Sequence, residues 1–393
     1  MTMNEKPLGK RRGRRSRKRV LMALAYYDNQ LYRGITRFAR DADWTLDTSM
    51  VHYGLLPHYW TGDGIIASFV ATRPEVTEFV LSRNCATLCL YGECPEVNVP
   101  RILMDDYEIG RQGAQYFLDR HFEHFAFAQF NENITVKRRE AGFRETVLQA
   151  GGHYHLLNFT DLIEAESVNL AACFRQMLQS IPKPLALLAQ SDHRASLLIS
   201  LARTVGIAVP DTVSILGIDN NEQISSFAEI PISSINCGRE EMAYQGAQLL
   251  NELMTRGSSL TFPVIRQPMG IVTRQSSNIY AISNRPALRA MQFIEEHYLE
   301  PISVRDVVRA SRTNRASLYE SFEKLFKRSI GETITGQRVQ YASYLLTTTE
   351  EKISDIADMS GFLNMENFCR VFKKTLGLRP TEYRAARKNE ISQ

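Results

Sequence analysis

The clearest chemistry in this sequence belongs to polar and basic side chains in two similar patterns, entered at Ser303 and at Ile353. Each pattern predicts a short helix, a tight turn and a longer helix. An α-helix fits the major groove of DNA, and paired helices can enter two successive grooves on one side of the duplex. We therefore expect base or phosphate contacts from the outer faces of the longer helices, which carry Arg315, Tyr319, Glu320, Met365, Glu366, Asn367, Arg370, Lys373 and Lys374.

Apolar residues at helical spacing are expected to bury the opposite faces of the same helices. Ser303 and Asp306 can form a capping box that begins the first pattern. A connecting helix is predicted over 334–346, between the two patterns. The apolar positions are Leu318, Phe322 and Phe326 in the first pattern and Phe368, Phe372 and Leu376 in the second.

The rest of the chain has a different periodicity. From Arg19 to about Gly270, short apolar strands such as Val20–Ala25 alternate with amphipathic helices such as Gln30–Arg40. This alternation predicts an α/β fold of doubly wound parallel sheets, either one large or two smaller ones, with ligands bound beyond the carboxyl ends of the strands. An all-α domain with two helix-turn-helix units follows. The expected segments are a basic arm at 1–18, an α/β domain at 19–275, a linker at 276–285 and a DNA-binding domain at 286–390.

Charge is distributed unevenly along the 393 residues. The net charge is +4, of which residues 1–19 carry +8 and residues 286–393 carry +3, so the residues between carry −7. Basic ends are typical of a protein whose ends meet phosphate. The N-terminal arm is either a solubilising tail or a segment that follows the phosphate backbone. No apolar run has the length of a membrane helix and the N-terminus has no signal-peptide core, so we expect a cytoplasmic protein without a membrane partner.

Motifs of the common enzyme classes are missing from the sequence. There is no GxGxxG, GxxxxGK[ST], GxSxG or HExxH, which argues against a nucleotide enzyme or a hydrolase. The six cysteines do not follow a zinc pattern. We expect no catalytic residue, no cofactor and no metal.

The helical segment also carries a specific set of residue spacings. Over about 286–387 this set resembles the AraC/XylS family of transcription regulators, and the resemblance implies two DNA-reading units. Arg312 and Lys327 stand where the family often has Gly, and Lys352 stands where a capping Ser is common. The first unit is therefore expected to be looser or differently angled. The matching residues are Arg338-x-x-x-Ala342-x-x-Leu345-Leu346, Ile353-x-x-Ile356-Ala357-x-x-x-Gly361-Phe362, Phe368-x-Arg370-x-Phe372-Lys373-Lys374, Gly377 and Arg379-Pro380-x-x-Tyr383-Arg384.

The middle segment resembles the LacI/GalR-type and periplasmic sugar-binding domains. The fragments that match are Arg33-Gly34-Ile35, Asp63-Gly64-Ile65-Ile66, Arg139-x-x-Gly142-Phe143-Arg144, Ser191-Asp192 and Val209-Pro210-Asp211-x-Val213-Ser214-Ile215-x-Gly217-Ile218-Asp219. This resemblance implies two lobes that close on a sugar. The resemblance does not extend to the N-terminal helix-turn-helix of LacI-type regulators, so we expect DNA reading at the other end of the chain.

The resemblance also implies a set of ligand-binding residues. A sugar hydroxyl both donates and accepts hydrogen bonds, so carboxylates and an arginine fork satisfy it well. Each residue of the set could instead be a helix cap or part of an ion pair. Trp60 and Phe69 could stack on a sugar face, although packing in the core is the favoured alternative. The set is Asp28, Arg139, Ser191, Asp192 and Asp219.

A sugar-binding module followed by an AraC-type domain resembles the regulators of xylose operons. We expect a homodimeric transcription activator of a pentose operon that binds operator DNA, a sugar effector such as D-xylose, and RNA polymerase. Three alternatives stay open: a repressor, a regulator that senses a hexose or a non-sugar molecule, and, least favoured, a sugar-modifying enzyme.

Overall fold

The computed structural model describes residues 17–90, 93–162, 169–256, 262–282, 284–349 and 351–385. These residues form two compact units. The first unit contains residues up to 103 and residues 239–264, and the second contains residues 104–238 and those from 265 onward. The chain therefore passes between the units three times. Almost all of the expected basic arm lies outside the described residues.

The first unit is built around a four-stranded parallel sheet with the order β2-β1-β3-β4. The strands are almost entirely apolar, and β1 and β3 are buried except at Arg19, which is typical of a parallel sheet covered on both faces. The strands are β1 (Arg19–Leu24), β2 (Thr45–Asp47), β3 (Gly64–Ser68) and β4 (Ala86–Cys89), and the helices are α1 (Asn29–Asp41), α2 (Ser49–Tyr53), α3 (Pro74–Leu81) and α9 (Arg239–Arg256).

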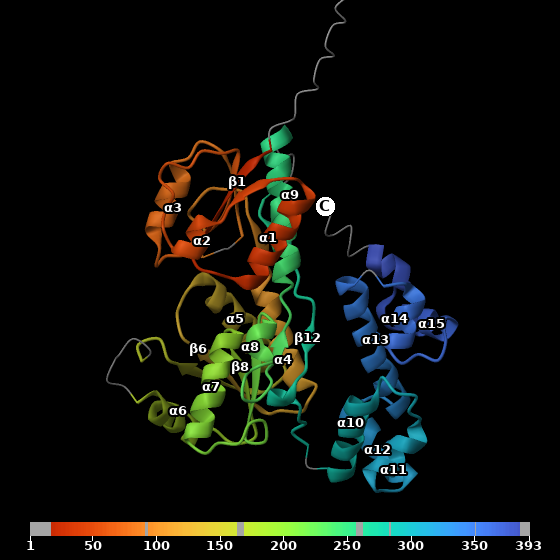
Figure 1. Cartoon of the computed structure of the whole chain (residues 1–393). Coiled ribbons are helices and arrows are strands. Elements are labelled where there is room, and N and C mark those ends of the chain that lie inside the picture. The colour runs from red at the N-terminus through yellow and green to blue at the C-terminus, as the bar shows by residue number, and fades with distance from the viewer. Residues whose placement is uncertain are drawn as a thin grey trace, which may run out of the picture. The chain divides into compact units, whose positions relative to one another are not determined.

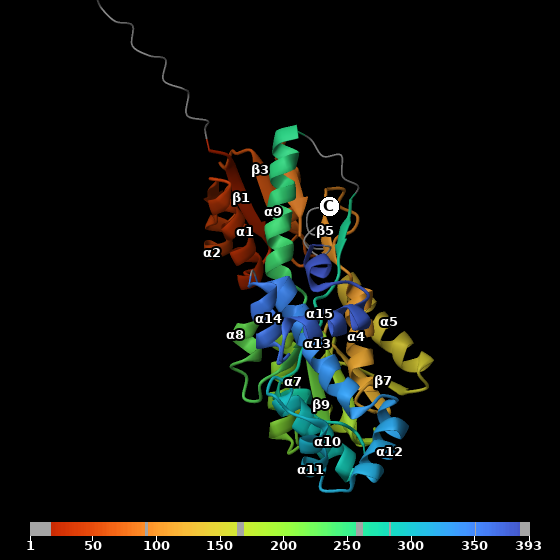
Figure 2. The same cartoon turned by 90° about the vertical axis from the view of Figure 1, so that its right-hand side faces the viewer.

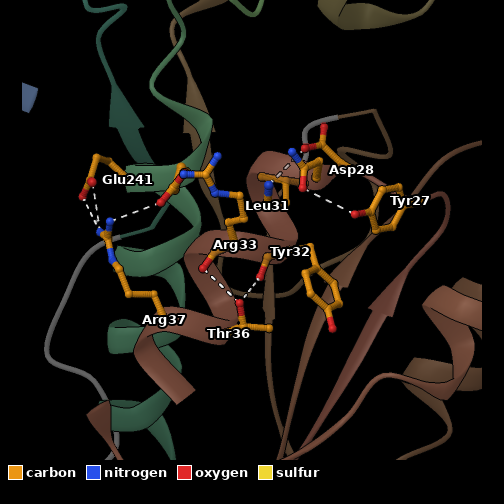
Figure 3. Close-up of polar contacts among 10 residues, drawn as sticks. Tyr27, Asp28, Leu31, Tyr32, Arg33, Thr36, Arg37 and Glu241 are labelled. Carbon is orange, nitrogen blue, oxygen red and sulfur yellow. Dashed lines mark hydrogen bonds and ion pairs between the residues drawn. The ribbon is translucent and has the colours of Figure 1, made fainter. Parts of the chain in front are cut away.

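Helices α1 and α9 lie side by side although about 200 residues separate them, as Figures 1 and 2 both show. Gly34 permits this approach, because a Cβ atom at that position would collide with the backbone carbonyl of Glu240. Arg37 fixes the pair from the side with a bidentate contact to Glu241, at 2.9 Å from each carboxylate oxygen (Figure 3).

The second unit contains a six-stranded sheet with the order β12-β10-β9-β8-β6-β7. All of its strand pairs are parallel except β10 with β12. The strands are β6 (His124–Gln129), β7 (His153–Asn158), β8 (Leu185–Ala189), β9 (Val213–Ile218), β10 (Ser233–Ile235) and β12 (Ile271–Val272), and the helices are α4 (Asp106–Leu118), α5 (Ile134–Gln149), α6 (Leu170–Gln179), α7 (Asp192–Thr204) and α8 (Glu222–Ser225). Strands β5 (Ile102–Met104) and β11 (Val264–Arg266) form a separate two-stranded sheet where the chain changes units.

The C-terminal part of the second unit is helical and has two hydrophobic cores, one for each helix-turn-helix unit. Ile330 and Ile334 at the start of α13 belong to the first core, and Leu345 and Leu346 near its end belong to the second. Helix α13 therefore joins the two units, as expected. The helices are α10 (Arg285–His297), α11 (Val304–Ser311), α12 (Arg315–Phe326), α13 (Ile330–Thr348), α14 (Ile353–Met359) and α15 (Met365–Leu376).

These features confirm the fold class predicted from the sequence. Of the two arrangements left open for the α/β segment, the structure has two smaller sheets. The segment between the α/β elements and α10 contains one short 3-10 helix, Gln275–Ser277.

Candidate functional site

Arg139 is the centre of a charged cluster in the second unit. It lies on α5, is 9% exposed, and donates from Nε to Asp106 at 2.9 Å and from Nη1 to the carbonyl of Gln190 at 2.9 Å. Burial alone would lower the pKa of Arg139, but the carboxylates of Asp106 and Asp219 outweigh it, so the pKa is raised. The guanidinium therefore stays charged, and its two bonds use only two of its five N–H donors.

Asp219 and Asn220 form a sharp turn directly after β9. Both have left-handed backbone conformations, with φ of 108° and 49°. The backbone N–H of Asn220 donates to Ser234 Oγ at 2.9 Å, and Arg274 donates to the Asn220 side chain at 2.9 Å. Non-glycine residues in this region of φ concentrate at ligand-binding sites, where the surrounding structure holds them. The strand end thus presents the Asp219 carboxylate on the side of Arg139.

Asp192 lies beside this turn, but the residue is only 1% exposed. It accepts hydrogen bonds from the backbone N–H of Asn221 at 2.7 Å and from Ser234 Oγ at 2.5 Å. Burial raises the pKa of Asp192 to about 7, against the opposing effect of these two hydrogen bonds. Ser191 caps α7 by accepting from the backbone N–H of Arg194. Ser191 and Asp192 therefore hold the strand ends in place.

In the first unit, Asp28 follows β1 and caps α1. Its Oδ1 accepts from the backbone N–H of Leu31 at 3.0 Å, as Figure 3 shows, and its Oδ2 pairs with Arg239 at 3.0 Å. Both side chains of the pair are largely buried. Both alternatives to ligand binding, a helix cap and an ion pair, thus describe Asp28 in this structure. Trp60 and Phe69 lie in the hydrophobic core of the same unit, which agrees with the favoured alternative.

The first helix-turn-helix unit begins at the expected capping box of Ser303 and Asp306. Leu318 and Phe322 are buried on the inner face of α12, and Phe326 is partly buried. Arg315, Tyr319 and Glu320 are exposed on its outer face, and the guanidinium of Arg315 lies 5.1 Å from the ring centre of Tyr319.

The second unit presents α15 in the same way. Phe368 and Phe372 are buried, but Leu376 is 40% exposed, so the expectation that Leu376 lines the core is wrong. Leu376 is the last residue of α15, where the helix ends at the left-handed Gly377. Asn367 is half-buried and accepts from Arg370 Nη2 at 3.0 Å. The remaining predicted contacts, Met365, Glu366, Arg370, Lys373 and Lys374, are exposed.

The turns of the two units differ in the residue that takes the left-handed conformation. Arg312 and Lys327 have φ of 56° and 52°, where the resemblance leads one to expect Gly, whereas Gly361 and Gly377 have φ of 75° and 79°. The first unit thus has the left-handed backbone conformation that favours glycine, but at residues with a Cβ atom, for which this conformation costs free energy. Lys352 stands at the N-cap of α14 and makes no side-chain capping bond.

Two further features bear on the kind of protein. Across the described part of the chain, no three His, Cys, Asp or Glu side chains are grouped so that they could hold a metal ion. Within those same residues no helix is long and apolar enough to cross a membrane.

Two residues of the charged clusters were not predicted from the sequence. Asp106, the partner of Arg139, follows the very short strand β5, and Arg239, the partner of Asp28, opens α9 about 200 residues away. Only the position of Asp106 two residues after a short strand could have indicated it.

Comparison with known proteins matches both parts of the chain. The model of the periplasmic binding protein-like domain family matches residues 114–277, and that of the helix-turn-helix domain family matches residues 307–386. The xylose operon regulatory protein of Escherichia coli strain K12 is 26% identical to this chain, over 91% of this chain and 94% of its own length. The xylose operon regulatory protein of Haemophilus influenzae is 25% identical to this chain, over 91% of this chain and 95% of its own length. A solved structure described as the xylose-binding transcription activator XylR covers 95% of this chain and 99% of its own, with a TM-score of 0.57 and 24% identity.

Proposed function

We propose that this chain, which joins a periplasmic-binding-protein-like domain to a helix-turn-helix domain, is a sugar-responsive transcription regulator that activates a pentose operon. The observation that carries the proposal is the alignment over 91% of the chain with xylose operon regulatory proteins, because it includes both domains in the same order. Those relatives are regulatory proteins, and this chain is likewise a regulator and not an enzyme. Fold alone does not fix function, so each site is argued from its own chemistry.

The sugar site in the second unit is centred on Arg139 and Asp219. The Arg139 guanidinium donates to ring hydroxyls with the N–H groups that Asp106 and Gln190 do not use, and the Asp219 carboxylate accepts from them. Asp192 with Ser191 positions the strand ends. In the first unit, Asp28 is a separate candidate, a carboxylate that follows β1 as Asp219 follows β9. We expect D-xylose to be the effector, because the relatives are named as regulators of xylose operons.

The DNA site is formed by the exposed faces of α12 and α15. Arg315, Tyr319 and Glu320 read one major groove, and Met365, Glu366, Asn367 and Arg370 read the next. Lys373 and Lys374 bind phosphates, which positions the protein without adding sequence information. A homodimer in the cytoplasm then engages four groove segments and recruits RNA polymerase.

A repressor, or a regulator of a different sugar, is the second candidate, because sugar-binding domains of this fold serve regulators of other specificities. One solved relative is a cellobiose complex of the regulator CelR, with a TM-score of 0.53 and 18% identity over 66% of this chain.

The decisive experiment is a thermal-shift titration of the full chain with monosaccharides, followed by DNA binding with and without the sugar that binds. A cognate sugar stabilises by about 2.7 kcal/mol at 100 times its Kd, which raises the Tm measurably. We expect D-xylose to raise the Tm and glucose, at equal concentration, to leave it unchanged. A Tm that no pentose alters would overturn the sugar assignment.

A further inference from the structure

The C-terminal end of α4 makes a buried ion pair with the helical part of the same unit. Arg120, two residues beyond α4, donates from Nη2 to Glu295 Oε1 of α10 at 3.0 Å. The two side chains are 9% and 10% exposed. A pair this well shielded from water is far more demanding in geometry than a surface ion pair.

Aromatic rings complete the contact. Tyr280 donates to the same Glu295 oxygen at 2.8 Å, and the Arg120 guanidinium lies 3.7 Å from the ring centre of Tyr116 and 5.2 Å from that of Tyr280. The carbonyl of Arg120 accepts from the backbone N–H of Ala281 at 2.8 Å. The segment that leads into α10 is therefore held to the end of α4 by both backbone and side chain.

The contact also reaches a DNA-reading helix. His121, next to Arg120, packs edge-on against Phe326, the last residue of α12, with ring centres 5.2 Å apart. Phe326 in turn packs on Tyr280 and Phe322 of the first helix-turn-helix core. A displacement at the end of α4 would therefore act on α10 through Arg120 and on α12 through His121.

The opposite end of α4 lies in the sugar site. Asp106, its first residue, binds Arg139 of α5 at 2.9 Å. The two helices touch along their backbones: a Cβ atom on Gly110 would collide with the carbonyl of Arg139, and one on Gly142 with that of Tyr107. Helices in such backbone contact cannot slide independently, because packed interiors do not deform smoothly. Any shift of Arg139 must move α4 with it.

We propose that α4 transmits the state of the sugar site to the DNA-binding helices, and that Arg120 and Glu295 are the positioning residues that connect it to α10. The 13 residues of α4 span about 20 Å as one rigid helix. The inference deepens the proposed function and rests on it. Replacing a buried pair by apolar residues often leaves stability unchanged, so the role of this pair is sought in regulation.

The test compares the full chain with the double variant Arg120→Met/Glu295→Leu. The measured quantity is the response ratio, the Kd for a DNA duplex without D-xylose divided by the Kd with saturating D-xylose; the duplex is one selected from a random pool by the unmodified protein. We expect the response ratio of the double variant to lie within twofold of 1, unlike that of the unmodified chain. The Kd of the double variant for D-xylose should differ less than threefold from that of the unmodified chain. The milder Tyr280→Phe, which removes one hydroxyl, should reduce the ratio in part.

The matched control is Arg203→Met/Glu229→Leu, which removes an exposed ion pair of similar length, 2.9 Å, in the same unit. It should leave the response ratio unchanged. A double-mutant cycle on urea unfolding tests the Arg120–Glu295 contact without sugar or DNA. A coupling of zero, or a normal response ratio in the double variant, overturns the inference alone. An unmodified chain that binds the duplex equally with and without D-xylose overturns the proposed function and this inference together.

Discussion

Arg312 and Gly361 hold equivalent left-handed positions in the turns of the two helix-turn-helix units, with φ of 56° and 75°. Only the second position requires glycine for space, since a Cβ atom there would lie 2.8 Å from the carbonyl oxygen of Leu299 and 2.9 Å from that of Tyr298. The first unit instead carries a conformational cost in its backbone.

Arg312→Gly is expected to stabilise the chain. The left-handed conformation costs an L-residue about 1–2 kcal/mol, and the added freedom of Gly in the unfolded chain offsets roughly half of that. The free energy of unfolding in urea should rise by about 0.5–1 kcal/mol. Arg309→Gly, in the interior of α11, should lower it by about 1 kcal/mol. A destabilised Arg312→Gly variant would mean that the Arg312 side chain makes a contact more valuable than the strain.

Lys352→Ser should also stabilise the helical domain. Lys352 is the N-cap of α14 and makes no side-chain capping bond, whereas Ser303 caps α11 in a box with Asp306. Asp355 stands three residues after Lys352, at the position where such a box is completed. We expect about 1 kcal/mol of added stability from urea unfolding. The reverse change, Ser303→Lys, should lower the free energy of unfolding by a similar amount. If neither variant differs in stability from the unmodified chain, side-chain capping does not matter at these two helix ends.

The long, strongly periodic elements could be predicted from the sequence because their apolar faces are continuous. Strand β1 (Arg19–Leu24) and helix α1 (Asn29–Asp41) begin and end within one residue of the predicted Val20–Ala25 and Gln30–Arg40. Strand β7 (His153–Asn158) was missed, because it is an edge strand with mostly exposed or half-buried residues and no apolar run. β10 (Ser233–Ile235), with two serines in three residues, was missed although it is buried.

The sites were harder to predict than the fold, because partners far apart in sequence meet in space. The pattern around Arg139 indicated a binding residue, but nothing in the sequence pairs it with Asp106. Likewise, the burial of Asp192 could not be read from its position after a strand, where an exposed carboxylate is equally common. The outer faces of α12 and α15 were predictable, since helical periodicity alone separates their exposed from their buried residues.

Asp192 should make the stability of the chain depend on pH. Burial raises the pKa of Asp192 in the folded protein to about 7, well above its ordinary value, so the folded state keeps a proton that the unfolded state loses. The contribution is therefore full below about pH 4 and is lost as pH rises through about 7. Asp192→Asn should flatten this fall between pH 5 and 8 in urea unfolding. Asp211→Asn, an exposed site, is the control; an unchanged slope in Asp192→Asn would show that Asp192 is ionised throughout.

Arg139→Lys should weaken sugar binding at least tenfold, or about 1.4 kcal/mol. A lysine keeps the charge but cannot donate in the fixed fork that joins Asp106 and the Gln190 carbonyl. Isothermal titration with D-xylose measures the change. The neighbouring Arg138→Lys keeps its charge on an exposed side chain and should bind normally. Normal affinity in Arg139→Lys would remove Arg139 from the sugar site.

Arg370 and Lys373 should separate sequence reading from phosphate binding on one helix. Both are exposed on α15, and Arg370 Nη2 donates to Asn367 Oδ1 at 3.0 Å. Arg370→Lys keeps the charge but loses bidentate base contact, so it should lower the ratio of specific to non-specific affinity by about 1–3 kcal/mol. Lys373→Ala should weaken binding to both kinds of duplex alike and reduce the salt slope, d log K/d log[salt], by about 0.9. Fluorescence anisotropy over a salt series measures both quantities. Equal loss of selectivity in the two variants would mean that α15 lies differently in the groove, with Lys373 also reading bases.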